Sequence, residues 1–203
     1  KLYLTAAFLN FLNHYIFGIP VYISAVLLFV KETPSLDGAA APPYPMIALQ
    51  IIGILFVHSL CYYQAHKTFH SCPGYYKYHK FHHRFNTFVP PSSANAVGKV
   101  EYLFAYVLPF AVASAVVRPF GLAFNISIYI VSMTNLSIHT PKIEEWSERN
   151  LPAFLVSTHD HLEHHRKLNV HYAAPTFNID WAVNTVHTYL GKEHTQKATE
   201  VEN

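Results

Sequence analysis

Four long apolar segments constrain the fold of this chain more than any other feature. They occupy residues 2–30, 46–63, 100–117 and 122–138, and they carry few charged side chains. A helix needs about 20 apolar residues to cross a hydrocarbon core of about 30 Å. Because lipid offers no partners to backbone N–H and C=O groups, such segments cross it as helices. The sequence therefore predicts an all-α integral membrane protein with about four hydrophobic membrane segments.

The first segment is too long for one perpendicular crossing. A helix through residues 2–30 would measure roughly 43 Å at about 1.5 Å per residue. We therefore expect residues 15–30 to cross the membrane, and the preceding half to lie at the interface or against other helices. Pro20 is expected to kink this helix, because proline has no N–H to donate.

Turn signals separate the remaining segments. Residues 31–45 and 86–98 are rich in proline and small residues and are predicted to be loops. The stretch 118–121, Arg-Pro-Phe-Gly, predicts a tight break between two antiparallel helices, and Pro141 ends the second of them. We interpret residues 1–191 as one domain and residues 192–203 as a polar tail that we expect to be mobile.

Fifteen histidines are the second unusual feature of the sequence. Most of them fall into sets spaced by three or four residues, within residues 66–83 and 139–171, and on a helix this spacing brings side chains onto one face. A neutral imidazole offers one lone pair to a metal and suits iron, zinc or copper. The predicted metal ligands are His66, His70, His79, His82, His83, His139, His161, His164 and His165.

Nine imidazoles are too many for one ion, so the set predicts two metals that keep open positions for oxygen and substrate. Such nitrogen-rich open sites favour iron. Structural zinc usually has thiolate ligands, whereas this chain has two cysteines and no Cys-x-x-Cys motif. Zinc could fill the site in a purified sample, but it has no redox chemistry, so that form would be inert for oxidation.

Three further residues leave alternatives open. Asp160 could hydrogen-bond the second ring nitrogen of a ligand and fix its tautomer, or it could cap the start of a helix. His171 could be a tenth ligand, although a structural role is favoured. His58 lies inside the second apolar segment, and we expect it to hydrogen-bond another helix.

The number of crossings places all histidine motifs on one side of the membrane. The second segment ends at His66, and the helical hairpin crosses twice before His139. The same side carries most of the basic residues, whereas the opposite side has Lys31 and Arg118. By the positive-inside rule the histidine-rich helical cap faces the cytosol. The basic residues on the histidine side are Lys67, Lys77, Lys80, Arg84, Lys99, Lys142, Arg149, Arg166 and Lys167.

The motifs between residues 62 and 181 resemble the fatty acid hydroxylase and sterol desaturase superfamily of membrane histidine-box oxygenases. In that superfamily a His-x-x-x-His pair is followed closely by His-x-x-His-His, as here at residues 66–70 and 79–83. The Pro-Pro-x-x-Ala-x-Ala stretch that ends near Glu101 is similar to its loop into the next helix. The Asn135–His139 region and the set at residues 161–165 resemble its later motifs.

This resemblance implies two iron ions that activate O2, an apolar lipid substrate, and an external electron donor such as cytochrome b5 with its reductase. The implied reaction is hydroxylation, desaturation or epoxidation of a sterol, a squalene-type isoprenoid or a fatty acyl chain. The expected location is the endoplasmic reticulum membrane, with other organelle membranes left open. The net charge of +2 gives no indication of nucleic acid binding.

Two other classes of function compete with this interpretation. A non-catalytic membrane subunit of a larger complex could retain the oxygenase fold, although the intact ligand spacing argues against it. A metal transporter or sensor would need ligands within the membrane bundle, where only His14 and His58 are available.

Overall fold

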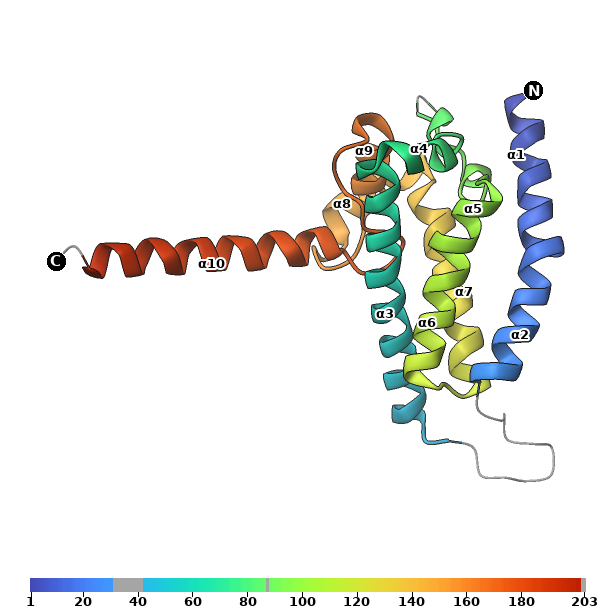
Figure 1. Ribbon diagram of the computed structural model, residues 1–203, viewed down its shortest axis with the longest axis horizontal. Coiled ribbons are helices and arrows are strands. Elements are labelled where there is room, and N and C mark those ends of the chain that lie inside the picture. Colours follow the sequence, from blue (N-terminus) through green and yellow to red (C-terminus); the bar gives the residue numbers. More distant parts are fainter. Residues whose placement is uncertain (31–41, 87, 202–203) are drawn as a thin grey trace.

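The computed structural model describes residues 1–30, 42–86 and 88–201. Within these ranges every regular element is a helix, and isolated bridge positions occur at Phe120 and between Leu155 and Phe177. Four helices are long and apolar enough to span a membrane, and they form the upright bundle of Figure 1. The prediction of an all-α integral membrane protein is confirmed. The four helices are Leu2–Phe29, Tyr44–Ser71, Lys99–Val117 and Gly121–Ile138.

The N-terminal helix is continuous over residues 2–29, and the division of residues 2–30 into a membrane-crossing half and a half at the interface or against other helices stays a prediction. The helix consists of α1 (Leu2–Phe11), a π-helical stretch η1 (Leu12–Gly18) and α2 (Ile19–Phe29). The irregularity therefore lies in the turns before Pro20, where the missing proline N–H leaves carbonyl groups that the wider π turn can accommodate. Asn13 anchors this stretch, because its buried side-chain amide donates to the carbonyls of Asn95 (3.1 Å) and Val97 (2.9 Å).

The second spanning helix, α3 (Tyr44–Ser71), carries the apolar segment without interruption into His66 and His70. Most of the preceding loop predicted at residues 31–45 lies outside the described residues. Helix α3 packs against α6 (Leu108–Val117) and α7 (Gly121–Ile138). The third spanning helix reaches α6 through α5 (Lys99–Glu101) and the π-helical η4 (Tyr102–Val107).

The predicted hairpin between α6 and α7 is confirmed. Arg118 adopts a left-handed conformation with φ of 52°, which ends α6. The backbone N–H of Phe120 donates to the side-chain oxygen of Gln50 at 3.0 Å. This bond satisfies a backbone donor at the turn and ties the hairpin to α3 at the end far from the histidines (Figure 1).

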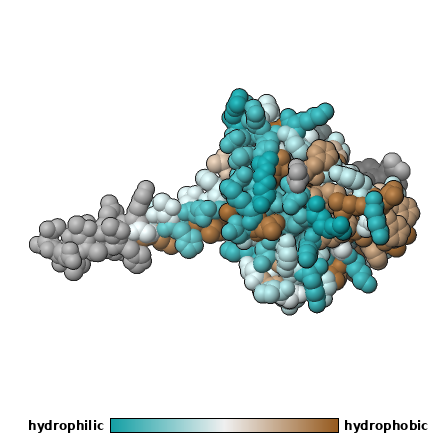
Figure 2. Space-filling view, turned by 90° about the horizontal axis from the view of Figure 1, so that it is seen from above, coloured by the Kyte–Doolittle hydropathy of each residue, from teal (hydrophilic) through white to brown (hydrophobic). Residues whose placement is uncertain are grey.

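Short helices form a cap over the other end of the bundle (Figure 1). Figure 2 looks down on this end and shows hydrophilic residues across much of it. After the cap, a long helix projects away from the bundle, and residues 192–201 continue this helix; that they form a mobile tail stays a prediction. The helices are α4 (Pro73–His79), η2 (His82–Arg84), η3 (Pro91–Ser93), η5 (Pro141–Ile143), α8 (Glu144–Asn150), α9 (Thr158–Lys167) and α10 (Ile179–Val201).

A hydrophobic core joins the cap to the bundle. It brings α3, η4 and α7 together with the C-terminal segment and lies beside the histidines. Because residues more than 100 positions apart in the chain meet in this core, it fixes how the separate histidine motifs face one another. Its buried members are Tyr62, Phe69, Ala105, Ile138, Val156, Ala173, Ala174 and Ile179.

Candidate metal centre

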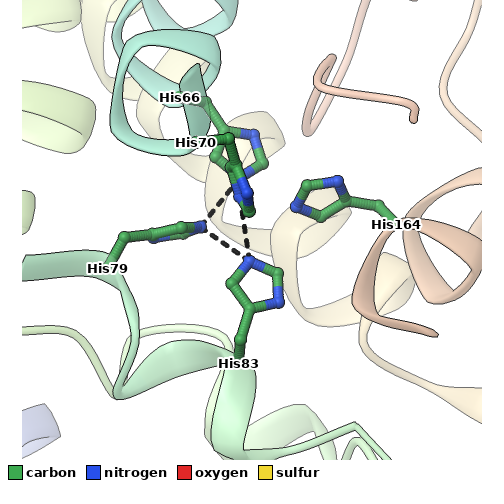
Figure 3. Close-up of side chains that lie close together, drawn as sticks. All are labelled: His66, His70, His79, His83 and His164. Carbon is green, nitrogen blue, oxygen red and sulfur yellow. Dashed lines mark hydrogen bonds between the residues drawn. The ribbon is translucent and has the colours of Figure 1, made fainter. Parts of the chain in front are cut away.

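The structure brings the nine predicted histidines together in two adjacent groups. Within each group the ring nitrogens lie within 4.8 Å of one another, and every ring except that of His70 is buried. Figure 3 shows the rings of the larger group converging from α3, from the α4 region and from α9. The five-histidine group is His66, His70, His79, His83 and His164, and the four-histidine group is His82, His139, His161 and His165.

Each His-x-x-His-His motif is divided between the two groups. The expectation that the three histidines of such a motif share one helical face is wrong for both motifs. His79 and His83 belong to the five-histidine group and His82 to the other, although a 3₁₀ turn replaces the α-helix here. On the continuous helix α9, His161 and His165 point to one group and His164 to the other. In each motif the first and last histidines share a group and the middle one joins the other group, because adjacent residues lie about 100° apart around a helix.

Backbone carbonyls determine which ring nitrogen carries the proton. Nδ1 of His66 lies 2.8 Å from the carbonyl oxygen of Tyr172, and Nδ1 of His164 lies 2.7 Å from that of Val170. Nδ1 of His139 lies 2.7 Å from the carbonyl of Asn135. Because a carbonyl can only accept, each Nδ1 must donate, which leaves Nε2 with a lone pair in the neutral ring. All three Nε2 atoms belong to the groups described above.

The Nε2 atoms of the five-histidine group form a chain of short contacts. The distances are 3.0 Å between His66 and His79, 2.8 Å between His79 and His83, and 3.1 Å between His83 and His70, as the dashed lines in Figure 3 show. Nδ1 of His66 donates to a carbonyl and Nδ1 of His79 lies against the carboxylate of Glu101, so both Nε2 atoms carry lone pairs in the neutral rings. The contact between these two Nε2 atoms is therefore not a hydrogen bond, whereas a cation at the centre of the group would accept both lone pairs.

The four-histidine group has the same arrangement. Nε2 of His139 lies 3.4 Å from that of His82 and 3.1 Å from that of His161, which in turn lies 3.2 Å from Nε2 of His165. In the larger group, Nε2 of His164 is buried without a hydrogen-bond partner among the described residues. These donor sets fit metal ions, since convergent lone pairs without protons between them repel one another unless a cation is shared.

Burial keeps these rings uncharged. Outside the spanning helices, it lowers the pKa of His139 to about 4 and that of His164 to about 3. The pKa of His161 is lowered well below the usual value, first by desolvation and then by the neighbouring histidines. An imidazolium would lose its hydration in this interior. At neutral pH the lone pairs are therefore available to a metal.

Glu101 is a functional candidate that the sequence reasoning did not single out. Its side chain is 1% exposed, and one carboxylate oxygen lies 2.6 Å from Nδ1 of His79. Placing an acid at the start of an apolar spanning helix costs free energy unless the acid has a partner or a function. The position of Glu101 in the sequence could therefore have identified it as a candidate. A carboxylate that accepts from Nδ1 directs the Nε2 lone pair of His79 toward the five-histidine group.

Asp160 and His171 lie outside both groups. Asp160 caps α9 instead of orienting a histidine, because its carboxylate accepts from the backbone N–H (3.1 Å) and the hydroxyl (2.9 Å) of Ser157. His171 is partly exposed, and its Nδ1 lies 3.7 Å from Asp160. This capping box starts α9 at Thr158, three residues before His161, so the carboxylate of Asp160 stabilises the start of the helix.

His58 does not make the hydrogen bond to another helix that we expected. Its ring is buried, its Nδ1 has no hydrogen-bond partner among the described residues, and it packs on Phe110 with 4.5 Å between ring centroids. It lies outside both histidine groups.

Glu101→Leu is expected to weaken metal binding by about 10- to 100-fold, the usual effect of removing a partner that orients a ligand. Glu101→Gln keeps an oxygen that can accept a hydrogen bond from His79, so its metal affinity should fall by a smaller factor. Chelator competition on the purified protein measures both affinities. The matched control is Glu145→Gln, because Glu145 is exposed on α8 and pairs only with Arg149 among the described residues. Equal affinities for Glu101→Leu and the unmodified protein would contradict the orienting role.

Comparison with known proteins supplies one match. The fatty acid hydroxylase family model matches residues 51–185, a range that contains all nine histidines of the two groups and Glu101. A search of curated proteins finds no match, and a search of solved structures finds none either.

Proposed function

The chain belongs to the fatty acid hydroxylase family, and on this premise we propose that it uses two iron ions and O2 to hydroxylate, desaturate or epoxidise an apolar lipid. Family membership together with the two histidine groups identifies a membrane di-iron oxidoreductase. One observation carries the proposal furthest. The two groups of converging imidazoles lie side by side at one end of a bundle of four candidate membrane helices.

The proposed ligands are the four and five histidines of the two groups, and the open positions would be available to O2 and substrate. Iron at these positions supplies the redox chemistry that imidazole side chains lack. The chain itself holds the rings neutral by burial, directs His66, His139 and His164 through backbone carbonyls, and orients His79 through Glu101.

The atom balance requires an outside source of electrons. In hydroxylation, one oxygen atom of O2 enters a C–H bond and the other leaves as water, which consumes two electrons and two protons. Desaturation consumes the same electrons and protons but removes two hydrogen atoms from the lipid and releases two waters. We propose that a one-electron carrier such as cytochrome b5, reduced by its reductase, supplies the electrons.

The proposed membrane is that of the endoplasmic reticulum, with the cap facing the cytosol. The histidine end carries Lys77, Lys80 and Arg84, whereas the described hairpin turn at the opposite end carries Arg118. This asymmetry supports a cytosolic cap because basic residues are enriched on the cytosolic side of membrane proteins. The proposed substrates are a sterol, a squalene-type isoprenoid or a fatty acyl chain.

The iron-loaded protein, supplied with NADH, cytochrome b5 and its reductase, is expected to convert an apolar lipid from the extract of a sterol-producing host. Mass spectrometry should detect a product that has gained one oxygen atom from isotopically heavy O2, or has lost two hydrogen atoms. The zinc-loaded protein is the matched control and should form none, because zinc has no redox chemistry. If iron occupies both groups and electron transfer is verified, but no lipid changes, the catalytic proposal fails.

A further inference from the structure

A cavity of about 320 Å³ lies inside the membrane bundle, between the N-terminal helix and the pair formed by η4–α6 and α7. Its wall on α7 extends from Phe124 to Asn135, a distance of about 16 Å at about 1.5 Å per residue. A cavity of this length, parallel to the spanning helices, has the shape of an extended lipid chain. Its lining is apolar over most of that length, including Val21, Ala25, Ile128 and Val131.

The end of the cavity nearest the histidines is polar. Asn95 and Asn135 line it, and the side-chain amide of Asn135 donates to the side-chain oxygen of Asn95 at 3.2 Å. Tyr102 also lines it, and its hydroxyl has no hydrogen-bond partner among the described residues. A tyrosine hydroxyl within a membrane bundle usually has a partner. This end therefore offers a free hydrogen-bonding group to a ligand.

The polar end adjoins the four-histidine group. The backbone carbonyl of Asn135 accepts from Nδ1 of His139 at 2.7 Å, and Nε2 of the same ring belongs to that group. Asn135 therefore has two roles: it lines the cavity, and its backbone carbonyl orients the ring of His139, a proposed metal ligand. The opposite end, at Ala25 and Phe124, is three turns of α7 away from it.

We propose that this cavity binds the apolar body of the lipid substrate, with a neutral polar end group such as a hydroxyl or amide against Tyr102. This orientation places the carbons nearest the polar group at Asn135, one helical turn before His139, and the tail three helical turns away. Oxidation would therefore fall close to the polar end of the lipid and not at a distant point of its tail. The inference rests on the proposed lipid oxidation, but the binding site itself can be tested without turnover.

Photocrosslinking of the zinc-loaded protein, which does not oxidise the probe, tests the orientation directly. The probes are two long-chain primary alcohols, one with a diazirine next to the hydroxyl and one with a diazirine at the end of the tail. The first should label the surroundings of Asn95, Tyr102 and Asn135, and the second those of Ala25 and Phe124. Reversed labelling, or labelling confined to the outer surface of the bundle, overturns the proposal.

Two substitutions on adjacent residues of α7 provide the matched comparison. Ile128 lines the cavity, whereas Tyr129 is 65% exposed on the outer face of the same helix. Ile128→Trp should reduce labelling inside the cavity by about tenfold or more, since a bulky ring excludes the ligand from its site. Tyr129→Trp should leave it unchanged. Equal labelling in the two variants would also overturn the proposal.

The two proposals fail in distinguishable ways. If the alcohol probes label the cavity as expected but the iron-loaded protein oxidises no lipid, the binding site stands and the catalytic proposal fails. If the protein forms an oxidised lipid but the probes never enter the cavity, catalysis stands and this inference is wrong. A product oxidised far from its polar group would likewise overturn the inferred orientation.

Discussion

His139→Ala is expected to abolish turnover and to reduce the metal content from two ions per chain to one, while the protein stays folded in the membrane. Its Nε2 lies 3.1 Å from that of His161, and its Nδ1 donates to a carbonyl at the end of α7. Substitution leaves the four-histidine group with three imidazoles. The expected loss of turnover exceeds about 100-fold, beyond the range for residues that only orient a ligand.

The alternative role for His139 is structural, since a histidine at a helix C-terminus can stabilise the free carbonyls. In that case the substitution would cost only about 0.3–1 kcal/mol of stability and leave activity largely intact. Metal analysis and turnover measured on the same purified sample separate the two roles. His159→Ala is the control, because His159 lies on α9 near His161 but contacts Glu144 (3.3 Å) and belongs to neither group. Full activity with both metals retained in His139→Ala would remove this residue from the site.

Adjacent histidines are expected to hold different metals, and pairs of substitutions should reveal this. His82 shares a group with His139, whereas His83 belongs to the other group. The double variant His82→Ala/His139→Ala damages one group only and should retain one ion per chain. The double variant His83→Ala/His139→Ala removes one ligand from each group; its five-histidine group keeps four imidazoles and should hold its ion more weakly, so that a chelator concentration that leaves one ion in the first double variant should leave less than one ion per chain here.

The comparison works because the two double variants remove the same number of imidazoles and differ by one position in the sequence. Substitutions within one site are not additive, since the second removes a ligand from a site that has already lost its metal. The losses of metal caused by substitutions in separate sites should add. Identical metal contents in the two double variants would show that the histidines do not divide between the groups as the structure places them.

The sequence alone predicted the class of fold and the set of histidines. Segments of 18 or more apolar residues have one low-energy arrangement in lipid, because every backbone polar group must be paired within the chain. The hairpin around residues 118–121 was equally predictable, since its break lies between two apolar segments. Spacings of three and four identified the histidines as local sets, and the number of crossings predicted that these sets lie at the same end of the bundle, where the structure brings them together.

Local geometry was harder to predict. A kink was predicted near Pro20, and the structure shows π-helical turns just before this residue. Each His-x-x-His-His set was expected to share one helical face, but its middle histidine belongs to the other group. The position of Asp160, four residues before His164, was compatible with orienting a histidine or with capping a helix. The structure shows that Asp160 caps the start of α9.

Spacing along the chain determined which residues could be ligands, and only the tertiary structure decided which of them act together. His66 and His164 are 98 positions apart, and no local pattern records that their rings belong to one group while His161 belongs to the other. The same holds for Glu101 beside His79 and for the carbonyls of Val170 and Tyr172, which fix the tautomers. The physical reason is that helical periodicity acts over a few residues, whereas these contacts depend on how α3, α7 and α9 pack through a shared core.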